Sequence, residues 1–167
     1  MTTPSSPAAP TVRWSWRPFD ALTAAELYAV LQLRQRVFVV EQRCPYLDAD
    51  GSDDEAWHLL GWVDGPDGAP VLGAYVRIFG PGVKYPEASI GRVVTNPDVR
   101  RTGLGRTLMA EALRRCAELA PGDPIRIGAQ RYLEAFYASL GFVTTSPPYE
   151  EDGIEHVEMV RGADAGR

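Results

Sequence analysis

The sequence predicts an α/β fold. Its most regular stretch, residues 89–120, begins as a short apolar strand, breaks at Asn96-Pro97 and continues past Gly103 as a helical pattern. In that helical part apolar residues recur at three- and four-residue spacings, which indicates an amphipathic helix with one buried face. Short strand-like segments bounded by turn residues lie on both sides of this stretch. A chain of 167 residues, 45% hydrophobic and 23% charged, is long enough for one core.

The expected domain spans residues 12–161. Residues 1–11 consist mainly of Thr, Ser, Pro and Ala without periodicity, a composition that predicts a disordered N-terminal tail. Residues 162–167 are expected to form a loose C-terminal tail. No compositional break divides the chain between these two tails, so we expect a single domain.

The first elements are a strand at residues 12–17 and a helix that follows it. Thr23 and Glu26 have the spacing of a capping box, which predicts a helix from there to about Phe38. Arg34 falls inside the apolar stripe of this helix, so its guanidinium either extends to solvent or pairs with a carboxylate.

Later elements are separated by glycine- and proline-containing turns. Residues 64–68 carry a glycine-rich hairpin signal, and Gly141 ends a short helix. The further strands are expected at residues 57–63, 71–79, 89–95, 125–129, 142–145 and 154–160, and the further helices at residues 104–120 and 131–140.

Carboxylates gather in the segment of residues 39–55. Counted as a calcium loop from Asp48, the segment has Asp53 where glycine is required and Leu59 where the last glutamate is required, so the EF-hand interpretation fails. Two interpretations stay open: a solvated acidic loop, or carboxylates that contribute to a functional site.

Composition excludes several classes of partner. The formal net charge of −5 argues against nucleic acid, and the absence of an apolar run near ~20 residues argues against a membrane span. Without a signal-peptide pattern, Cys44 and Cys116 are expected to stay reduced in the cytoplasm. His58 and His156 have no metal-ligand spacing, so we expect no metal.

The start of the helix at residue 104 has an unusual charge pattern. Arg100, Arg101 and Arg106 crowd a helix end whose dipole already carries about half a positive charge. This pattern favours a bound anion, above all a phosphate, held by backbone N–H groups that Gly103 and Gly105 leave accessible. The alternative is an ordinary solvated loop. Neither the Walker A nor the Rossmann pattern fits.

The run RRTGLGR resembles the RxxGxG pyrophosphate loop of the GCN5-related N-acetyltransferase (GNAT) superfamily. Together with LLGW, VFVVEQRCPYLDADGSD and YEEDGIEH it resembles the ElaA-type branch, over roughly residues 14–160. The resemblance implies a GNAT fold, with a mixed, mostly antiparallel central sheet of six to seven strands and about four flanking helices. It also implies acetyl-CoA as the cofactor.

The resemblance also implies which residues contact the cofactor. The backbone of Val93, Val94 and Thr95 would bind the pantetheine arm, and Tyr137 would lie beside the sulfur. Where the superfamily usually has an asparagine upstream of this tyrosine, the chain has Gln130, one methylene longer. The pyrophosphate loop would comprise Arg100, Arg101, Thr102, Gly103, Leu104, Gly105 and Arg106.

The function implied is transfer of an acetyl group to a primary amine, by direct attack in a ternary complex. A backbone N–H at Val93 or Val94 would stabilise the oxyanion, and Tyr137 would protonate the departing thiolate. An imidazole titrates in the range that suits a general base. Four candidates for that base remain open: Glu41, Asp50, Asp53 and His156.

Two other functions are considered. One is an acyl-CoA-binding or sensor domain without turnover, and the other is a covalent route through Cys44, which the resemblance does not support. The partner expected is an amine acceptor, either a small molecule or a protein amine. A monomer or a homodimer is expected.

Overall fold

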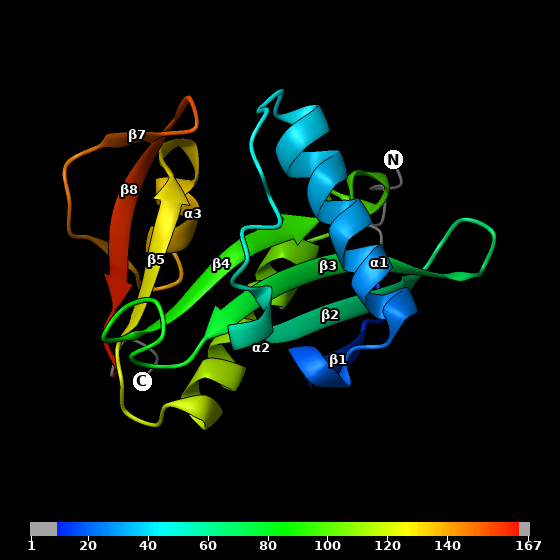
Figure 1. Cartoon of the computed structure of the whole chain (residues 1–167), viewed down its shortest axis with the longest axis horizontal. Helices are drawn as coiled ribbons and strands as arrows, with labels where there is room; N and C mark the ends of the chain where they lie inside the picture. Colours follow the sequence, from blue (N-terminus) through cyan, green and yellow to red (C-terminus); the bar gives the residue numbers. More distant parts are fainter. Residues whose placement is uncertain (1–9, 164–167) are drawn as a thin grey trace, which may run out of the picture.

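The computed structural model describes residues 10–163, which form one mixed sheet with helices on both faces (Figure 1). Apart from residues 10–11 and 162–163, the tails expected at residues 1–11 and 162–167 lie outside this range. Within it the sheet has eight strands, in the order β1-β2-β3-β4-β5-β8-β6, with β7 paired to β8. The strands are β1 (Arg13–Pro18), β2 (Trp57–Asp64), β3 (Pro70–Phe79), β4 (Ala88–Thr95), β5 (Ile125–Gln130), β6 (Val143–Thr144), β7 (Tyr149–Glu151) and β8 (Ile154–Arg161).

The predicted mixed, mostly antiparallel sheet is confirmed. All neighbouring strands run antiparallel except β4 and β5, which are parallel. The short strand β7 raises the count from the predicted six or seven to eight in the described range. The same range has three α-helices where about four were expected: α1 (Ala24–Arg34), α2 (Leu104–Leu119) and α3 (Glu134–Ala138).

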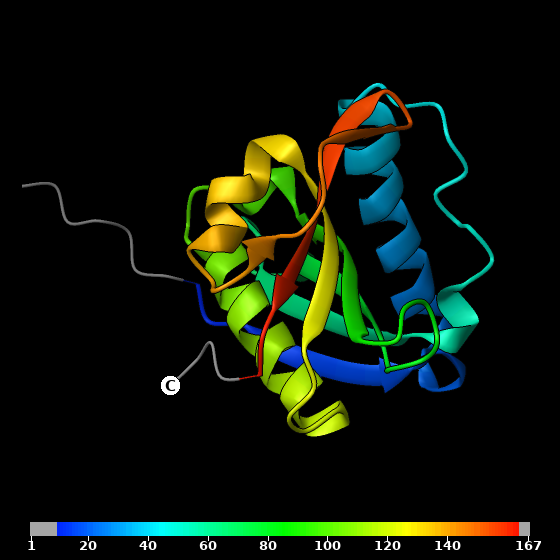
Figure 2. The same cartoon turned by 90° about the vertical axis from the view of Figure 1, so that its left-hand side faces the viewer.

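Helices α1 and α2 cover opposite faces of the sheet (Figure 2). On the face of α2, Leu108, Met109 and Ala112 pack with strand residues in the larger of two buried clusters. On the face of α1, Val30 and Leu33 pack with strand residues in the second cluster. Successive residues of a strand point to opposite faces of the sheet, and both faces are covered by helices. The buried strands are therefore nearly continuous runs of apolar residues.

The capping box predicted for α1 is confirmed by reciprocal hydrogen bonds. The Glu26 N–H donates to Thr23 Oγ1 at 3.1 Å, and the Thr23 N–H donates to the Glu26 carboxylate at 2.9 Å. The α-helix ends at Arg34 and continues as the π-helix η2 (Gln35–Glu41), so the helical segment extends beyond the predicted Phe38. No helix in the described part of the chain is long and apolar enough to cross a membrane.

Candidate active site

The candidate site lies where β4 and β5 separate. These parallel strands pair only at Ala88 with Ile125 and at Ser89 with Arg126, and beyond those pairs they diverge (Figure 1). A cavity of about 970 Å³ lies there, lined by residues of both strands. After Ser89, no strand in the described range pairs with β4 on the side of β5. The backbone N–H and C=O groups on that edge of β4 are therefore free to bind a ligand.

A β-bulge shapes the same stretch of β4. Between the pairs of Tyr75 with Val94 and of Arg77 with Gly91, β4 has one residue more than β3. Arg92, inside the bulge, has a φ of +54°, a left-handed conformation that is uncommon outside glycine. Bulges re-aim the residues around them. The predicted oxyanion donors, the N–H groups of Val93 and Val94, therefore lie at a local irregularity of the strand that lines the cavity.

The N-terminus of α2 borders the cavity with its backbone exposed. Gly103, at the N-cap, has a φ of +77°, and neither a capping side chain nor an acidic first-turn residue is present in this described helix. A Cβ built at Gly103 or Gly105 would meet no atom of the described chain within 4 Å. No side chain or other described atom therefore crowds the backbone at these two positions, which suits the close approach of an anion.

The arginines near this helix differ in their surroundings. Arg100 lines the cavity and its guanidinium donates to the Glu41 carboxylate at 2.7 Å. Arg101 has a φ of +65° and is exposed. Arg106 lies with its guanidinium carbon 5.3 Å from the ring centre of Phe136. The salt bridge joins the predicted phosphate loop to the end of η2, which places Glu41 at the cavity wall.

Tyr137 lies on α3 and lines the cavity. Its ring packs edge-on against Phe136 and Phe142, and the side chain is 6% exposed. Burial raises the pKa of Tyr137 to about 12, so the hydroxyl keeps its proton near neutral pH. Among the described residues this hydroxyl has no hydrogen-bond partner, so it is free to donate to a ligand.

Gln130 ends β5 and faces the helical segment across the cavity. Its side-chain amide donates to Gln42 Oε1 at 3.1 Å, and the Gln42 amide donates back at 3.4 Å. Both side chains line the cavity. This pair connects the two walls of the opening, at the position where the sequence resemblance implied an asparagine.

The acidic segment forms an ion-pair network with two buried arginines, Arg34 and Arg77, and with the partly exposed Arg92. Arg34 is fully buried, and it donates to Asp48 and to Asp53, both at 2.7 Å. Arg77, likewise buried, pairs with Asp50 at 2.8 Å and with Asp53 at 2.9 Å. Of the two possibilities for Arg34, pairing with carboxylates is the observed one. A solvated loop is wrong for Asp48, which is 4% exposed.

These pairs argue against two of the predicted bases. The hydrogen bond from Arg77 holds the pKa of Asp50 well below its usual range, and Arg92 pairs with the same carboxylate at 3.2 Å. Burial acts to raise the pKa of Asp53, but the bonds from Arg34 and Arg77 outweigh it and lower that pKa. A carboxylate so stabilised in its charged form is a weak proton acceptor.

His156 presents a free ring nitrogen instead. Its Nδ1 lies 2.7 Å from the Ile154 carbonyl oxygen. Because a carbonyl only accepts, Nδ1 must carry the hydrogen, and in the neutral ring Nε2 then has the lone pair. That nitrogen lies 3.9 Å from Glu151 Oε2, and the side chain lines the cavity. Among the four predicted bases, this geometry favours His156.

The sequence interpretation missed part of the cavity wall. The Tyr149 hydroxyl donates to Glu158 at 2.9 Å, and Tyr85 donates to the same oxygen at 3.5 Å. All three side chains line the cavity, beside Lys84. The period of two in β8 puts Glu158 on the same face as His156, which is the signal that would have found it.

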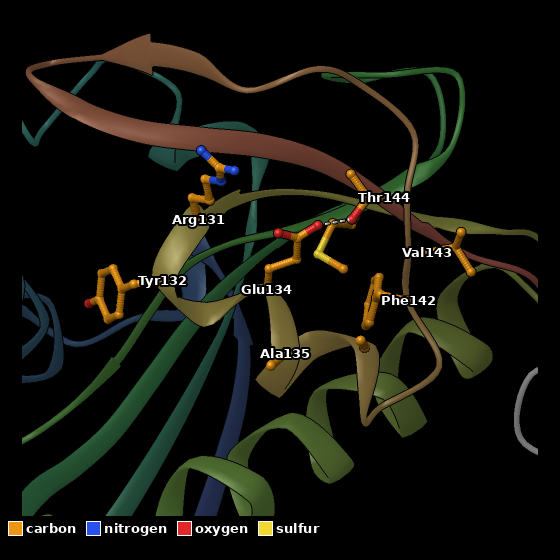
Figure 3. A pocket seen from close by; sticks show the side chains of 9 residues that line it. Arg131, Tyr132, Glu134, Ala135, Phe142, Val143 and Thr144 are labelled. Atoms are coloured by element: carbon orange, nitrogen blue, oxygen red, sulfur yellow. Dashed lines mark hydrogen bonds between the residues drawn. The ribbon is translucent and has the colours of Figure 1, made fainter.

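A second pocket, of about 590 Å³, lies outside the candidate site, between α3 and β6. Glu134 and Thr144 are hydrogen-bonded to each other there (Figure 3). No predicted catalytic residue lines it. In residues 10–163, no group of three or more His, Cys, Asp or Glu side chains could hold a metal ion.

Comparison with protein families gives a match over residues 71–162, to the acetyltransferase (GNAT) domain. Among curated proteins, the chain is 40% identical over 152 residues to protein ElaA of Escherichia coli, which covers 90% of this chain and 96% of ElaA. A protein of Synechocystis is 41% identical over 149 residues, covering 89% of this chain and 94% of that protein.

Solved structures agree with these matches. The crystal structure of an acyl-CoA N-acyltransferase from Pseudomonas aeruginosa superposes with a TM-score of 0.84 at 41% identity, covering 91% of this chain and all of that one. The crystal structure of Escherichia coli ElaA superposes with a TM-score of 0.80 at 40% identity, covering 90% of this chain and 99% of that one.

Proposed function

Because this chain belongs to the GNAT acetyltransferase family, in its ElaA-type branch, we propose that it transfers an acetyl group from acetyl-CoA to a primary amine. The family assignment confirms the resemblance to the GNAT superfamily and supports acyl transfer in general. Acetyl-CoA as the donor, an amine as the acceptor and direct attack in a ternary complex are the finer parts of the proposal. We also propose that residues 12–161 form the catalytic domain.

The residues present fit an acyl-CoA. Gly103 and Gly105 leave the first N–H groups of α2 open to a pyrophosphate, and a Cβ at either position would occupy that space. The edge of β4 from Val93 to Thr95, which faces the gap left by β5, offers backbone groups to the amides of the pantetheine arm. When bound, acyl-CoA supplies a thioester carbonyl that an amine can attack and a thiolate as leaving group.

Two groups of the chain suit the charges that develop in this reaction. A backbone N–H at Val93 or Val94 would donate to the carbonyl oxygen, because both residues line the cavity beside the bulge of β4. The Tyr137 hydroxyl would give its proton to the thiolate, since burial keeps that proton in place and the described chain offers it no other acceptor.

We assign the proton-accepting role to His156. Its Nε2 is available in the neutral ring, and Glu151 at 3.9 Å would stabilise the charged imidazolium. Glu41 is already paired with Arg100, so we give it the role of holding the phosphate loop against η2. We do not propose a covalent route through Cys44, because this buried thiol donates to the Asp152 carbonyl at 3.1 Å.

Both cysteines are buried and free, which supports a reducing compartment, and we propose the cytoplasm. The acidic net charge of −5 favours an amine over a nucleic acid as the partner. The proposed acceptor is a small-molecule amine or a protein amine, and the enzyme would act as a monomer or homodimer.

The observation that carries the proposal is one continuous cavity that joins the open N-terminus of α2 to Tyr137 and His156. A screen of a primary-amine library with acetyl-CoA, read out as free thiol, tests it. The proposal predicts thiol release with at least one amine. The alternative of a sensor domain predicts saturable acetyl-CoA binding and no release with any amine.

A further inference from the structure

Lys84 is the one lysine in the sequence of 167 residues. It lies in the loop between β3 and β4, and its side chain lines the cavity that also contains Tyr137 and His156. The chain otherwise uses arginine for its side-chain cations, and arginine is not a nucleophile because its guanidinium stays protonated. The chain therefore has a single side-chain primary amine, and that amine is at the proposed site of amine acylation.

The Lys84 amine has no ion-pair partner among residues 10–163. The two arginines that line the same cavity are both paired: Arg92 with Asp48 at 2.8 Å and Arg100 with Glu41 at 2.7 Å. The ring of Tyr85 lies beside Lys84, with its centre 5.6 Å from Nζ. No salt bridge thus fixes this amine in place, and its flexible four-carbon stem lets Nζ sample the cavity.

The surroundings of Lys84 also favour its neutral form. The residue as a whole is exposed, but burial of its amine end lowers the pKa of Lys84. The positive charges of Arg77 and Arg92 lower that pKa further, while Glu151 and Asp50 act in the opposite direction. A larger fraction of this amine is therefore uncharged at a given pH than in a fully solvated lysine, and only the uncharged amine is a nucleophile.

We propose that Lys84 is itself an acyl acceptor, so that the enzyme acylates its own cavity wall. This inference rests on the proposed function, since it uses the same acyl-CoA and the same catalytic groups. The lysine nitrogen bonds to the carbonyl carbon of the thioester as the carbon–sulfur bond breaks. The nitrogen loses its proton to His156 or to water, and Tyr137 protonates the departing sulfur, which leaves an amide on Lys84 and free coenzyme A.

The modification would change the acceptor end of the cavity. Acylation removes the positive charge of Lys84 and adds the volume of an acyl group beside Tyr85 and Glu151. The unmodified lysine repels a cationic acceptor, whereas the amide does not, and the added acyl group narrows the space. Self-acylation would therefore alter the choice of acceptor amine while leaving the phosphate loop, at the other end of the cavity, untouched.

The test is the mass of the purified full-length protein after incubation with acetyl-CoA, without added amine. We expect the mass to rise by one acetyl group, peptide mapping to place that group on Lys84, and Lys84→Arg, which keeps the charge, to lack it. If the enzyme catalyses this reaction, the rate of Lys84 acetylation should be at least about tenfold higher in the folded protein than in the urea-unfolded chain. Excess coenzyme A should suppress the reaction.

Each other result overturns the proposal. An adduct on the N-terminal amine alone, or one that forms equally fast in unfolded protein, would mean simple chemical acetylation. Thiol release with library amines but no adduct on Lys84 would remove the self-acylation and leave the proposed function intact. Absence of both the adduct and any thiol release would remove the two proposals together.

Discussion

Replacing Gly105 by alanine should stabilise the fold and weaken acyl-CoA binding at the same time. Gly105 lies in the first turn of α2, outside the set of residues with positive φ, and a Cβ there meets no described atom within 4 Å. Alanine in a helix is more stable than glycine by roughly 0.5–1 kcal/mol, which for a chain of this size raises Tm by about 1–4 °C. The added methyl group, however, occupies the space that we assign to the pyrophosphate.

The expected loss of affinity follows from the hydrogen bonds at stake. A backbone N–H that donates to a phosphate contributes about 1.5–3 kcal/mol, so losing one weakens acetyl-CoA binding by at least about tenfold. Isothermal titration calorimetry and a thermal melt measure the two effects on one sample. Gly80→Ala is a matched control. The new Cβ would lie 3.8 Å from Leu119, an ordinary contact distance, and Gly80 does not line the cavity. An unchanged affinity in a stabilised Gly105→Ala protein would refute the phosphate-loop assignment.

Other substitutions test the remaining parts of the site. Tyr137→Phe should lower kcat by at least about tenfold at unchanged acetyl-CoA affinity, because only the unpartnered hydroxyl is lost; an unaffected chemical step would make Tyr137 a packing residue. His156→Gln should lower kcat/KM by about 10²-fold, and an unchanged kcat/KM would point to another base. Arg34→Met should cost about 3–5 kcal/mol in urea unfolding, since it leaves the buried Asp48 with one fewer partner. A loss under about 1 kcal/mol would show that the remaining partners of Asp48, Arg92 and the Tyr46 hydroxyl, suffice. Because the pKa of Asp50 is lowered on folding, its contribution to stability is present above the ordinary aspartate pKa of about 4 and is lost as pH falls below it; Asp50→Asn should flatten that acid-side loss.

Local sequence signals predicted most of the fold. The capping box at Thr23 and Glu26, the hairpin glycines at residues 64–68 and the period of α2 are interactions between near neighbours, so the sequence displays them directly. The short strand β7 was missed because its three residues are too few for a visible period of two. The π-helix after Arg34 was also missed, since its apolar residues continue a helical pattern without a break.

The site was harder to predict because it depends on distant contacts. Asp50 and Asp53 resemble free bases in the sequence, but arginines that are far away along the chain neutralise them. Arg34 could face solvent or a carboxylate, and only the fold decides between these outcomes. The separation of β4 from β5 has no sequence signature of its own. A strand that pairs with its neighbour over only two residues has the same apolar pattern as one that pairs along its whole length.

Product analysis tests the central claim of acyl transfer to nitrogen most directly. The protein is mixed with carbonyl-labelled acetyl-CoA and the amine that releases the most thiol in the library screen, and the products are identified by NMR and mass spectrometry. The account predicts that the label appears in an amide on the acceptor nitrogen, with one free coenzyme A for each amide formed. Label recovered only as free acetate, or acetyl-CoA that is bound and returned intact, would contradict it.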